Sequence, residues 1–313
     1  MQEELLHIFP LHLRETLQKV TMKENTLEEI RIRIGQPVIF HMENEEWYLK
    51  KETGRLERSQ VNAYCATKED IKSMVKFISS YSLYAYEDEM KRGFITMQGG
   101  HRIGVAGQVV MDGGKVLSLS NIYFLNIRVA REKRGCAKDI IPYLIHRNNI
   151  YNTLFVSPPG IGKTTYLRDA IRILSNGSDR LHGMKISIID ERSEIAACRQ
   201  GIPQNDIGIR SDVLDGCLKS FGMLLMLRSM APQIIAVDEI GSREDCRAME
   251  QAIYSGSRIF GTVHAYDMKE LSRKKYLKEM LEQQMFGRIV LLEKAENGRR
   301  RFHIYDENLE KIC

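Results

Sequence analysis

Apolar and polar positions alternate early in the chain in a way that predicts strands. Residues 27–34 place isoleucine side chains on one face and Arg31 and Arg33 on the other, with Gly35 and Pro37 directly after them. A period of two is typical of a strand with one buried face. We therefore expect a strand here, with its two arginines in solvent.

A period close to 3.6 follows about forty residues later. Residues 67–70, Thr-Lys-Glu-Asp, have the composition of a helix N-cap with an acidic first turn. The apolar residues that come next share one helical face: Ile71, Met74, Val75 and Ile78. We expect further strands over 93–97 and 102–110, joined through Gly99 and Gly100, and over 126–131.

These elements predict a small α+β domain over residues 1–135. The charged break at 131–135, Arg-Glu-Lys-Arg-Gly, marks the boundary to a second domain over 136–313. We expect a helix over 137–147 at the start of this second domain.

Strands and helices alternate in the second half. Four nearly continuous apolar runs, at 153–156, 185–189, 233–237 and 258–263, are typical of parallel strands that are buried on both faces. Segments 286–292 and 301–305 flank Asn297-Gly298, which predicts a closing hairpin. The pattern indicates an α/β fold for the second domain.

Composition excludes several classes of protein. The 313 residues are 43% hydrophobic and 28% charged, which argues against disorder and fibrous structure. A net charge of +5 without a basic tail gives no reason to expect a nucleic-acid partner. No apolar run is long enough to cross a membrane, and the acidic start does not resemble a signal peptide. We expect a cytoplasmic protein whose six cysteines are reduced.

The strongest chemical motif begins where the first apolar strand of the second half ends. It resembles a P-loop, whose backbone N–H groups and following helix N-terminus bind nucleotide phosphates. We expect Lys163 to reach the β- and γ-phosphates of ATP and Thr164 to bind Mg²⁺. The predicted nucleotide-binding residues are Ser157, Pro158, Pro159, Gly160, Ile161, Gly162, Lys163, Thr164 and Thr165.

The first position of this motif departs from the usual pattern. A P-loop begins with glycine, whereas this chain has Ser157, a small residue that can usually manage the tight turn. The alternative is a strand–helix loop that resembles the motif by chance. The flanking strand and the Gly-Lys-Thr-Thr core favour the P-loop.

Two carboxylates follow the strand at 233–237. Strand ends of open α/β sheets point into the crevice where ligands bind. We expect Asp238 to hold Mg²⁺ and Glu239 to orient or deprotonate the attacking water. The alternative is an ordinary solvated strand end.

A similar acidic box follows the strand at 185–189, which we expect beside the P-loop strand. Glu191 is a candidate to act on the ligand shell of the metal or on the attacking water. Arg192 is a candidate to pair with Glu191 or to contact a phosphate. A structural salt-bridge cluster remains open. His264 ends the strand at 258–263 and is a candidate sensor of the γ-phosphate or a link to a neighbouring subunit. The alternative is a plain hydrogen-bonded histidine.

In this order, the motifs resemble the secretion-type motor ATPases, the hexameric engines of type II and type IV secretion and of pilus retraction. Further segments narrow the resemblance to the stage III sporulation protein AA family of endospore-forming bacteria. They span 29–37, 93–96, 99–107, 126–131, 157–165, 190–194 and 237–241. The resemblance covers about residues 25 to 310.

The resemblance implies a RecA/AAA+-like P-loop NTPase domain that hydrolyses ATP with Mg²⁺. It implies that the chain forms a homo-oligomer, namely a hexamer. This hexamer is expected in the mother cell, at the cytoplasmic face of a membrane complex, where it docks on a platform-like membrane protein. It also implies arginines that act across a cleft between subunits or domains. The candidates are Arg102, Arg128, Arg131 and Arg228.

Two alternatives to the motor remain open at this point. One is an ATP-dependent protein that binds single-stranded nucleic acid, and the other is a nucleotide-operated switch with negligible turnover. Secretion motors carry Gly-Glu at the acidic strand end, whereas Asp238-Glu239 is closer to the AAA+ pattern. Glu239 argues against the switch because a pure binder needs no catalytic acid.

Overall fold

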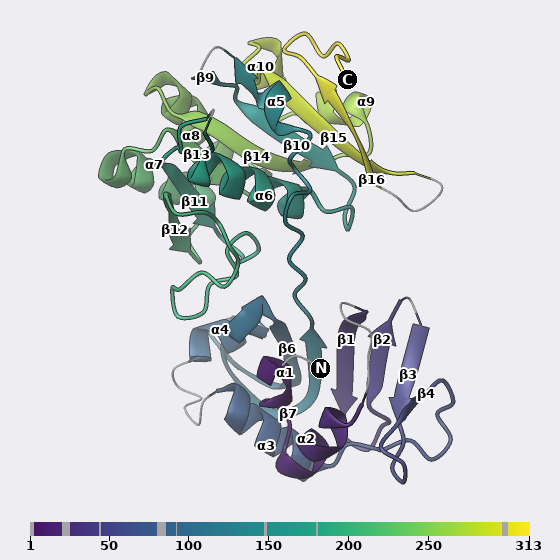
Figure 1. The fold of residues 1–313 in the computed structure, drawn as a ribbon. Coiled ribbons are helices and arrows are strands. Elements are labelled where there is room, and N and C mark those ends of the chain that lie inside the picture. Colours follow the sequence, from purple (N-terminus) through teal and green to yellow (C-terminus); the bar gives the residue numbers. More distant parts are fainter. Residues whose placement is uncertain are drawn as a thin grey trace. The chain divides into compact units, whose positions relative to one another are not determined.

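The computed structural model describes residues 3–20, 26–43, 45–79, 86–91, 93–146, 149–179, 181–295 and 300–313 (Figure 1). The chain divides into two compact units, Met1–Arg131 and Glu132–Cys313. Each unit has buried hydrophobic clusters of its own.

Unit 1 is built on a sheet with the order β4-β3-β2-β1-β7-β6-β5, in which all the pairings are antiparallel. Its strands are β1 (Leu27–Arg33), β2 (Ile39–Met42), β3 (Glu45–Leu49), β4 (Leu56–Glu57), β5 (Phe94–Thr96), β6 (Arg102–Asp112) and β7 (Lys115–Arg128). Its helices are α1 (Glu3–Leu6), α2 (Leu11–Gln18), α3 (Lys68–Ile78) and α4 (Glu87–Lys91).

The patterns that predicted β1 and α3 are confirmed. Ile30 and Ile32 are fully buried in β1, whereas Arg31 and Arg33 are only partly exposed and not fully solvated as we expected; Arg31 pairs with Glu29. Thr67 caps α3 through a capping box with Asp70, in which each side chain accepts a hydrogen bond from the other residue's backbone N–H. Two orphan donors at the start of the helix are thereby satisfied.

The β6–β7 hairpin is longer than the sequence pattern suggests. We expected its second strand to begin near residue 126, whereas β7 begins at Lys115. Val109, Val110 and Met111 are consecutive and all exposed. The outer part of the hairpin therefore lacks the alternation of buried and exposed positions from which a strand could be predicted.

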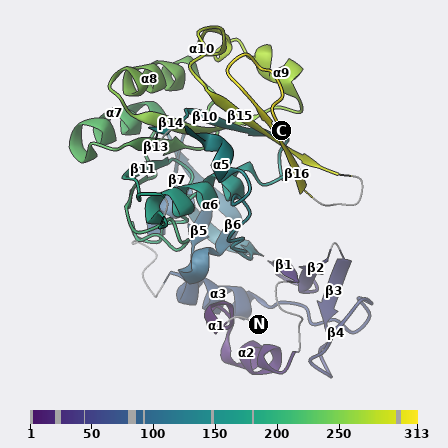
Figure 2. The same cartoon turned by 45° about the horizontal axis from the view of Figure 1, so that its top comes forward.

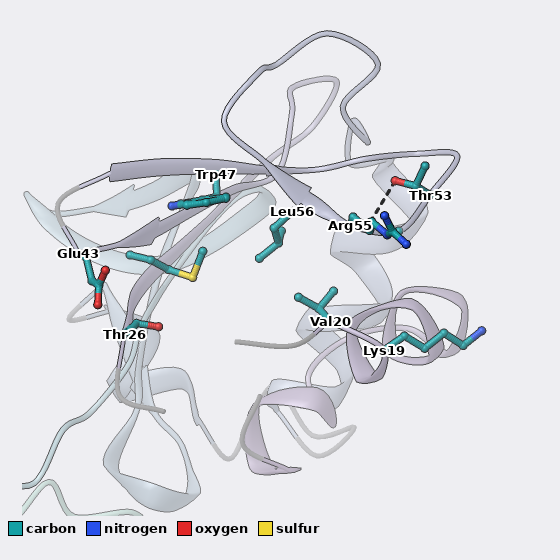
Figure 3. A pocket seen from close by; sticks show the side chains of 10 residues that line it. Lys19, Val20, Thr26, Glu43, Trp47, Thr53, Arg55 and Leu56 are labelled. Atoms are coloured by element: carbon teal, nitrogen blue, oxygen red, sulfur yellow. Dashed lines mark hydrogen bonds between the residues drawn. The ribbon is translucent and has the colours of Figure 1, made fainter. Parts of the chain in front are cut away.

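Unit 1 also contains a pocket of about 680 Å³, shown in Figure 3. Aromatic and aliphatic side chains line it together with charged ones, and none of the predicted site residues is among them. The lining residues are Lys19, Val20, Thr26, Met42, Glu43, Trp47, Thr53, Gly54, Arg55 and Leu56.

Unit 2 contains, within the described residues, a sheet with the order β12-β11-β13-β14-β10-β15-β16. All its pairings are parallel except β15–β16. Its strands are β10 (Thr153–Ser157), β11 (Ile186–Asp190), β12 (Ser211–Asp215), β13 (Ile234–Val237), β14 (Arg258–His264), β15 (Arg288–Lys294) and β16 (Arg300–Tyr305). A separate hairpin consists of β8 (Ile145–His146) and β9 (Asn149–Ile150).

Helices cover both faces of this sheet (Figures 1 and 2). Helix α6 packs on one face with Phe155, and α7 and α8 pack on the other with Leu154 and Val156. Alternate residues of β10 thus enter opposite cores, which explains its continuous apolar sequence. The helices of unit 2 are α5 (Ile141–Leu144), α6 (Lys163–Asn176), α7 (Lys219–Met230), α8 (Arg243–Tyr254), α9 (Met268–Ser272) and α10 (Lys278–Glu282).

The four predicted parallel strands are confirmed as β10, β11, β13 and β14, and β15 pairs with β16 as predicted. The turn that we predicted at Asn297-Gly298 lies outside the described residues. Strand β12 was not predicted: its mixed Ser-Asp-Val-Leu-Asp sequence follows a polar loop and carries no continuous apolar run.

Two sequence-based expectations are wrong. The helix expected over 137–147 is reduced to the four residues of α5, because Asp169 binds the backbone N–H groups of Gly135 and Ala137 and because β8 pairs with β9. Residue 147 itself lies outside the described residues. Strand β11 is not beside β10, since β13 and β14 lie between them. Order along the chain does not set order in a sheet whose strands are joined by crossovers.

Among the described residues, none of the helices combines the length and the apolar character that crossing a membrane requires.

Candidate active site

The loop from β10 to α6 is shaped by two left-handed glycines. Gly160 has φ 78° and Gly162, the N-cap of α6, has φ 111°. Residues with a Cβ rarely adopt such angles, so glycine is required at both positions. Ser157 is fully buried at the end of β10, and its hydroxyl donates to the carbonyl of Pro158 at 2.8 Å. The serine therefore fits as a strand residue before the turn.

The N-terminus of α6 has the features of an anion site. No side chain caps its first N–H groups, and its first turn contains no acidic residue. Unpaired N–H groups and the positive end of the helix dipole favour a bound anion. Lys163, the first residue of the helix, is 6% exposed and adds a charge inside this cradle.

Asp238 connects the loop to the acidic strand end. Its carboxylate accepts a hydrogen bond from the Thr164 hydroxyl at 2.8 Å, and a second from the Thr262 hydroxyl. A threonine hydroxyl beside a carboxylate is a pair of hard oxygen donors, which Mg²⁺ prefers. The two predicted metal ligands, Thr164 and Asp238, therefore lie together and fit the ion.

Glu239 has an unusual backbone for a residue with a side chain. Its φ is 52°, in the left-handed region, and its N–H donates to the Thr262 hydroxyl at 2.8 Å. Such a conformation costs free energy and persists only when its surroundings fix it. Thr262 contacts both acidic residues and thereby helps to fix the turn.

Three cationic or potentially cationic groups surround the Glu239 carboxylate. His264 Nε2 is 2.9 Å away, Arg192 Nη1 2.6 Å and Lys163 Nζ 3.5 Å. Burial alone would raise the pKa of Glu239, but His264, Lys163 and Arg192 together hold that pKa below its ordinary value. Glu239 is therefore ionised at neutral pH and able to accept a proton.

The structure brings four predicted residues together in this way: Lys163, Thr164, Asp238 and Glu239. His264 joins them because β14 pairs with β10 in the register Ser157↔His264. Arg192 also joins them, through its ion pair with Glu239.

The neighbouring Glu191 points elsewhere. Its carboxylate pairs with Lys219, at the start of α7. Asp190 is fully buried and accepts hydrogen bonds from the backbone N–H groups of Glu194, Ile195 and Ala196 at 2.7–3.0 Å. This acidic box therefore organises its own loop.

Three of the candidate arginines belong to unit 1. Arg102 lies over the Phe94 ring at 4.5 Å and is opposite Arg128 in the β6–β7 pairing. Arg131 donates to the carbonyl of Leu27 and pairs with Glu28. Arg102 and Arg128 are therefore part of the sheet of unit 1, and Arg131 contacts the start of β1.

Arg228 lies in the last turn of α7, shortly before β13 begins. Because Asp238 and Glu239 follow the other end of β13, Arg228 is at the opposite edge of the sheet from the acidic pair of its own chain.

Sequence reasoning missed Thr262. It lies two residues before His264 on β14, so the two side chains share a face of the strand. That spacing was the available signal.

Comparisons with known proteins identify relatives of the whole chain and of about half of it. Residues 1–312 match a family model described as "Sporulation stage III, protein AA". The chain is 38% identical over 306 residues to the stage III sporulation protein AA of Bacillus subtilis (strain 168), covering 97% of this chain and 95% of that protein. It is 32% identical over 155 residues to the uncharacterised protein ycf45 of Cyanidium caldarium, covering 49% of this chain and 44% of that protein.

Solved structures share the fold. The pilus retraction motor PilT, solved with bound ADP, aligns with a TM-score of 0.61 at 14% identity, covering 97% of this chain and 82% of that one. The ATPase DotB of Legionella pneumophila aligns with a TM-score of 0.55 at 16% identity, covering 94% and 77%. The predicted fold, a P-loop NTPase domain preceded by an α+β domain, is confirmed.

Proposed function

Because the chain belongs to the stage III sporulation protein AA family, we propose that it is a Mg²⁺-dependent ATPase that drives a secretion-like channel complex during endospore formation. The observation that carries this proposal is the convergence of Lys163, Thr164, Asp238 and Glu239 at one edge of the sheet. A phosphate cradle, a pair of metal ligands and an ionised carboxylate are the parts that phosphoryl transfer to water requires.

The loop residues bind the nucleotide in this proposal. The backbone N–H groups up to Gly162 hold the α- and β-phosphates, and Lys163 turns its ammonium group from Glu239 towards the β- and γ-phosphates. Thr164 and Asp238 hold Mg²⁺. When bound, the ion neutralises charge on the phosphate oxygens.

Glu239 performs the proton transfer. It orients a water molecule and accepts its proton while the water oxygen bonds to the γ-phosphorus and the bond to the β–γ bridging oxygen breaks. The products are ADP and inorganic phosphate. His264 hydrogen-bonds to Glu239 and positions it.

The last part of the proposal is that copies of this chain assemble into a ring. We assign residues 1–135 and 136–313 as its two domains, and we place the protein as a hexamer in the mother cell, on a platform-like membrane protein. Arg228 lies at the far edge of the sheet from its own acidic pair, so it reaches an active site only in a neighbouring subunit. Arg102 is the corresponding candidate from the N-terminal domain. Such an arginine contributes about 10³–10⁵ in rate.

The test is ATP hydrolysis by the full chain with and without Mg²⁺, alone and with the cytosolic part of the membrane partner. Lys163→Ala removes the buried charge of the cradle, and we expect it to abolish turnover and sporulation. Lys278→Ala is the matched control, because this lysine is exposed on α10. Turnover or sporulation that is equal in both variants contradicts the proposal.

A further inference from the structure

The C-terminal hairpin brings an arginine to the phosphate loop. Arg300 is the first residue of β16, and Figure 1 shows this strand beside the loop that joins β10 to α6. A Cβ placed on Gly162 would lie 3.1–3.2 Å from the Cζ and both Nη atoms of Arg300. The guanidinium group therefore covers the glycine that begins α6.

Arg300 is exposed to solvent, yet other sources of positive potential lie beside its guanidinium group. The N-terminus of α6 carries the positive end of the helix dipole, and Lys163 follows Gly162 directly. The Arg300 guanidinium forms no hydrogen bond or ion pair with any residue in the part of the chain that the structure describes. Three sources of positive potential thus gather at one loop, and a bound anion would relieve their repulsion.

The neighbours of Arg300 show beside which end of the phosphate loop its guanidinium group lies. It lies close enough to the Cys136 thiol and the Tyr166 hydroxyl to interact electrostatically with both. Cys136 in turn contacts the carbonyl of Thr165, with its Sγ 3.8 Å from the oxygen. Arg300 therefore lies on the Thr165 side of the loop, whereas Glu239 lies at the Lys163 ammonium group.

We propose that Arg300 binds the α- and β-phosphates of the nucleotide in its own subunit. This inference rests on the proposed function, because it assigns a further residue to the same phosphate site. In a P-loop the backbone cradle holds the α- and β-phosphates, which lie on the side where Arg300 is found. A planar guanidinium group can donate two parallel hydrogen bonds to phosphate oxygens.

The experiment compares nucleotide affinity in matched variants of the full chain. Kd is measured by calorimetry for ADP and for the non-hydrolysable analogue AMP-PNP, both with Mg²⁺. Arg300→Ala should weaken both nucleotides by about tenfold, the loss typical of a charge-assisted hydrogen bond. Arg300→Lys keeps the charge without the fork and should recover part of that loss. Arg301→Ala is the control, because successive residues of a strand point to opposite faces.

Each outcome decides the point. Equal weakening of ADP and AMP-PNP in Arg300→Ala, with Arg301→Ala within about twofold of wild type, supports the assignment. Loss confined to AMP-PNP places the arginine at the γ-phosphate and overturns it. Equal affinities in all variants overturn it as well, while the proposed function stands. Absence of nucleotide binding in the wild type, or unchanged binding in Lys163→Ala, overturns the proposed function itself.

Discussion

Two strand ends of unit 2 have nearly the same sequence and different structures. Strands β11 and β13 are both fully buried, and both lead into Asp-Glu. Asp238 and Glu239, after β13, contact the phosphate loop and His264. Asp190 and Glu191, after β11, bind the backbone of their own loop and Lys219.

The difference comes from the neighbours of each strand and not from the strand itself. β13 pairs with β14, which supplies Thr262 and His264 and itself pairs with β10. β11 has β12 and β13 as neighbours, so its acidic residues are one strand further from the loop. Arg192 links the two ends through its ion pair with Glu239. An acidic strand end thus becomes a candidate catalytic group through its place in the sheet order.

The largest expected effect separates the two glutamates. Glu239→Gln removes the proton acceptor, and we expect kcat to fall by about 10²–10⁴ while nucleotide binding persists. Glu191→Gln breaks only the pair with Lys219 and should leave kcat within about threefold of wild type. Steady-state phosphate release at saturating ATP and Mg²⁺ measures both. Equal losses of kcat in the two variants would mean that Glu191 also acts in catalysis, which would contradict the difference between the two strand ends.

Much of this site follows from residue order alone. The strand, the glycines and the Gly-Lys-Thr-Thr core identify the phosphate loop, because only a few residue types allow such a turn. The position of β11 does not follow, because sheet order depends on which strand packs best beside which. The partner of Glu191 does not follow either, since Lys219 begins α7, a helix with no clear periodic pattern that exposes Phe221 and Leu225.

The second prediction concerns stability. Asp190→Ala would leave three backbone N–H groups without their acceptor in a fully buried site, and we expect a loss of about 3 kcal/mol in the free energy of unfolding. The melting temperature should fall by roughly 5–10 °C. Asp238→Ala is the matched variant and should lower the melting temperature less while it abolishes Mg²⁺-dependent turnover. Thermal melts of both variants measure the two decreases in melting temperature. A larger decrease in Asp238→Ala than in Asp190→Ala would mean that Asp238 is the structural residue.

The third prediction uses the titration of Asp190. Burial raises its pKa to about 6, with a contribution from Asp215, although three backbone N–H groups oppose the shift. Between pH 6 and 4 the folded chain therefore holds a proton that the unfolded chain has lost. Asp190 then contributes more to stability as the pH falls through 6, by about 1.4 kcal/mol per pH unit within that window.

Asp190→Asn isolates this contribution because asparagine does not titrate. The difference in unfolding free energy, wild type minus variant, should increase as the pH is lowered from 7.5 to 5. Urea unfolding of the two proteins at a series of pH values measures it. A difference that stays constant over that range would mean that Asp190 keeps an ordinary pKa despite its burial.

The smallest expected effect tests the link between the two strand ends. Arg192 is 66% exposed, so its pair with Glu239 contributes little to stability. Its charge nevertheless helps to hold the pKa of Glu239 down. Arg192→Ala should let that pKa rise, so the acidic limb of the pH–kcat profile should move to higher pH while kcat at pH 8 changes by less than about threefold. Lys219→Ala removes the cation at the other strand end, and it should leave the profile in place because its partner is Glu191. A shift in Lys219→Ala equal to that in Arg192→Ala would show that the two acidic boxes act as one electrostatic unit.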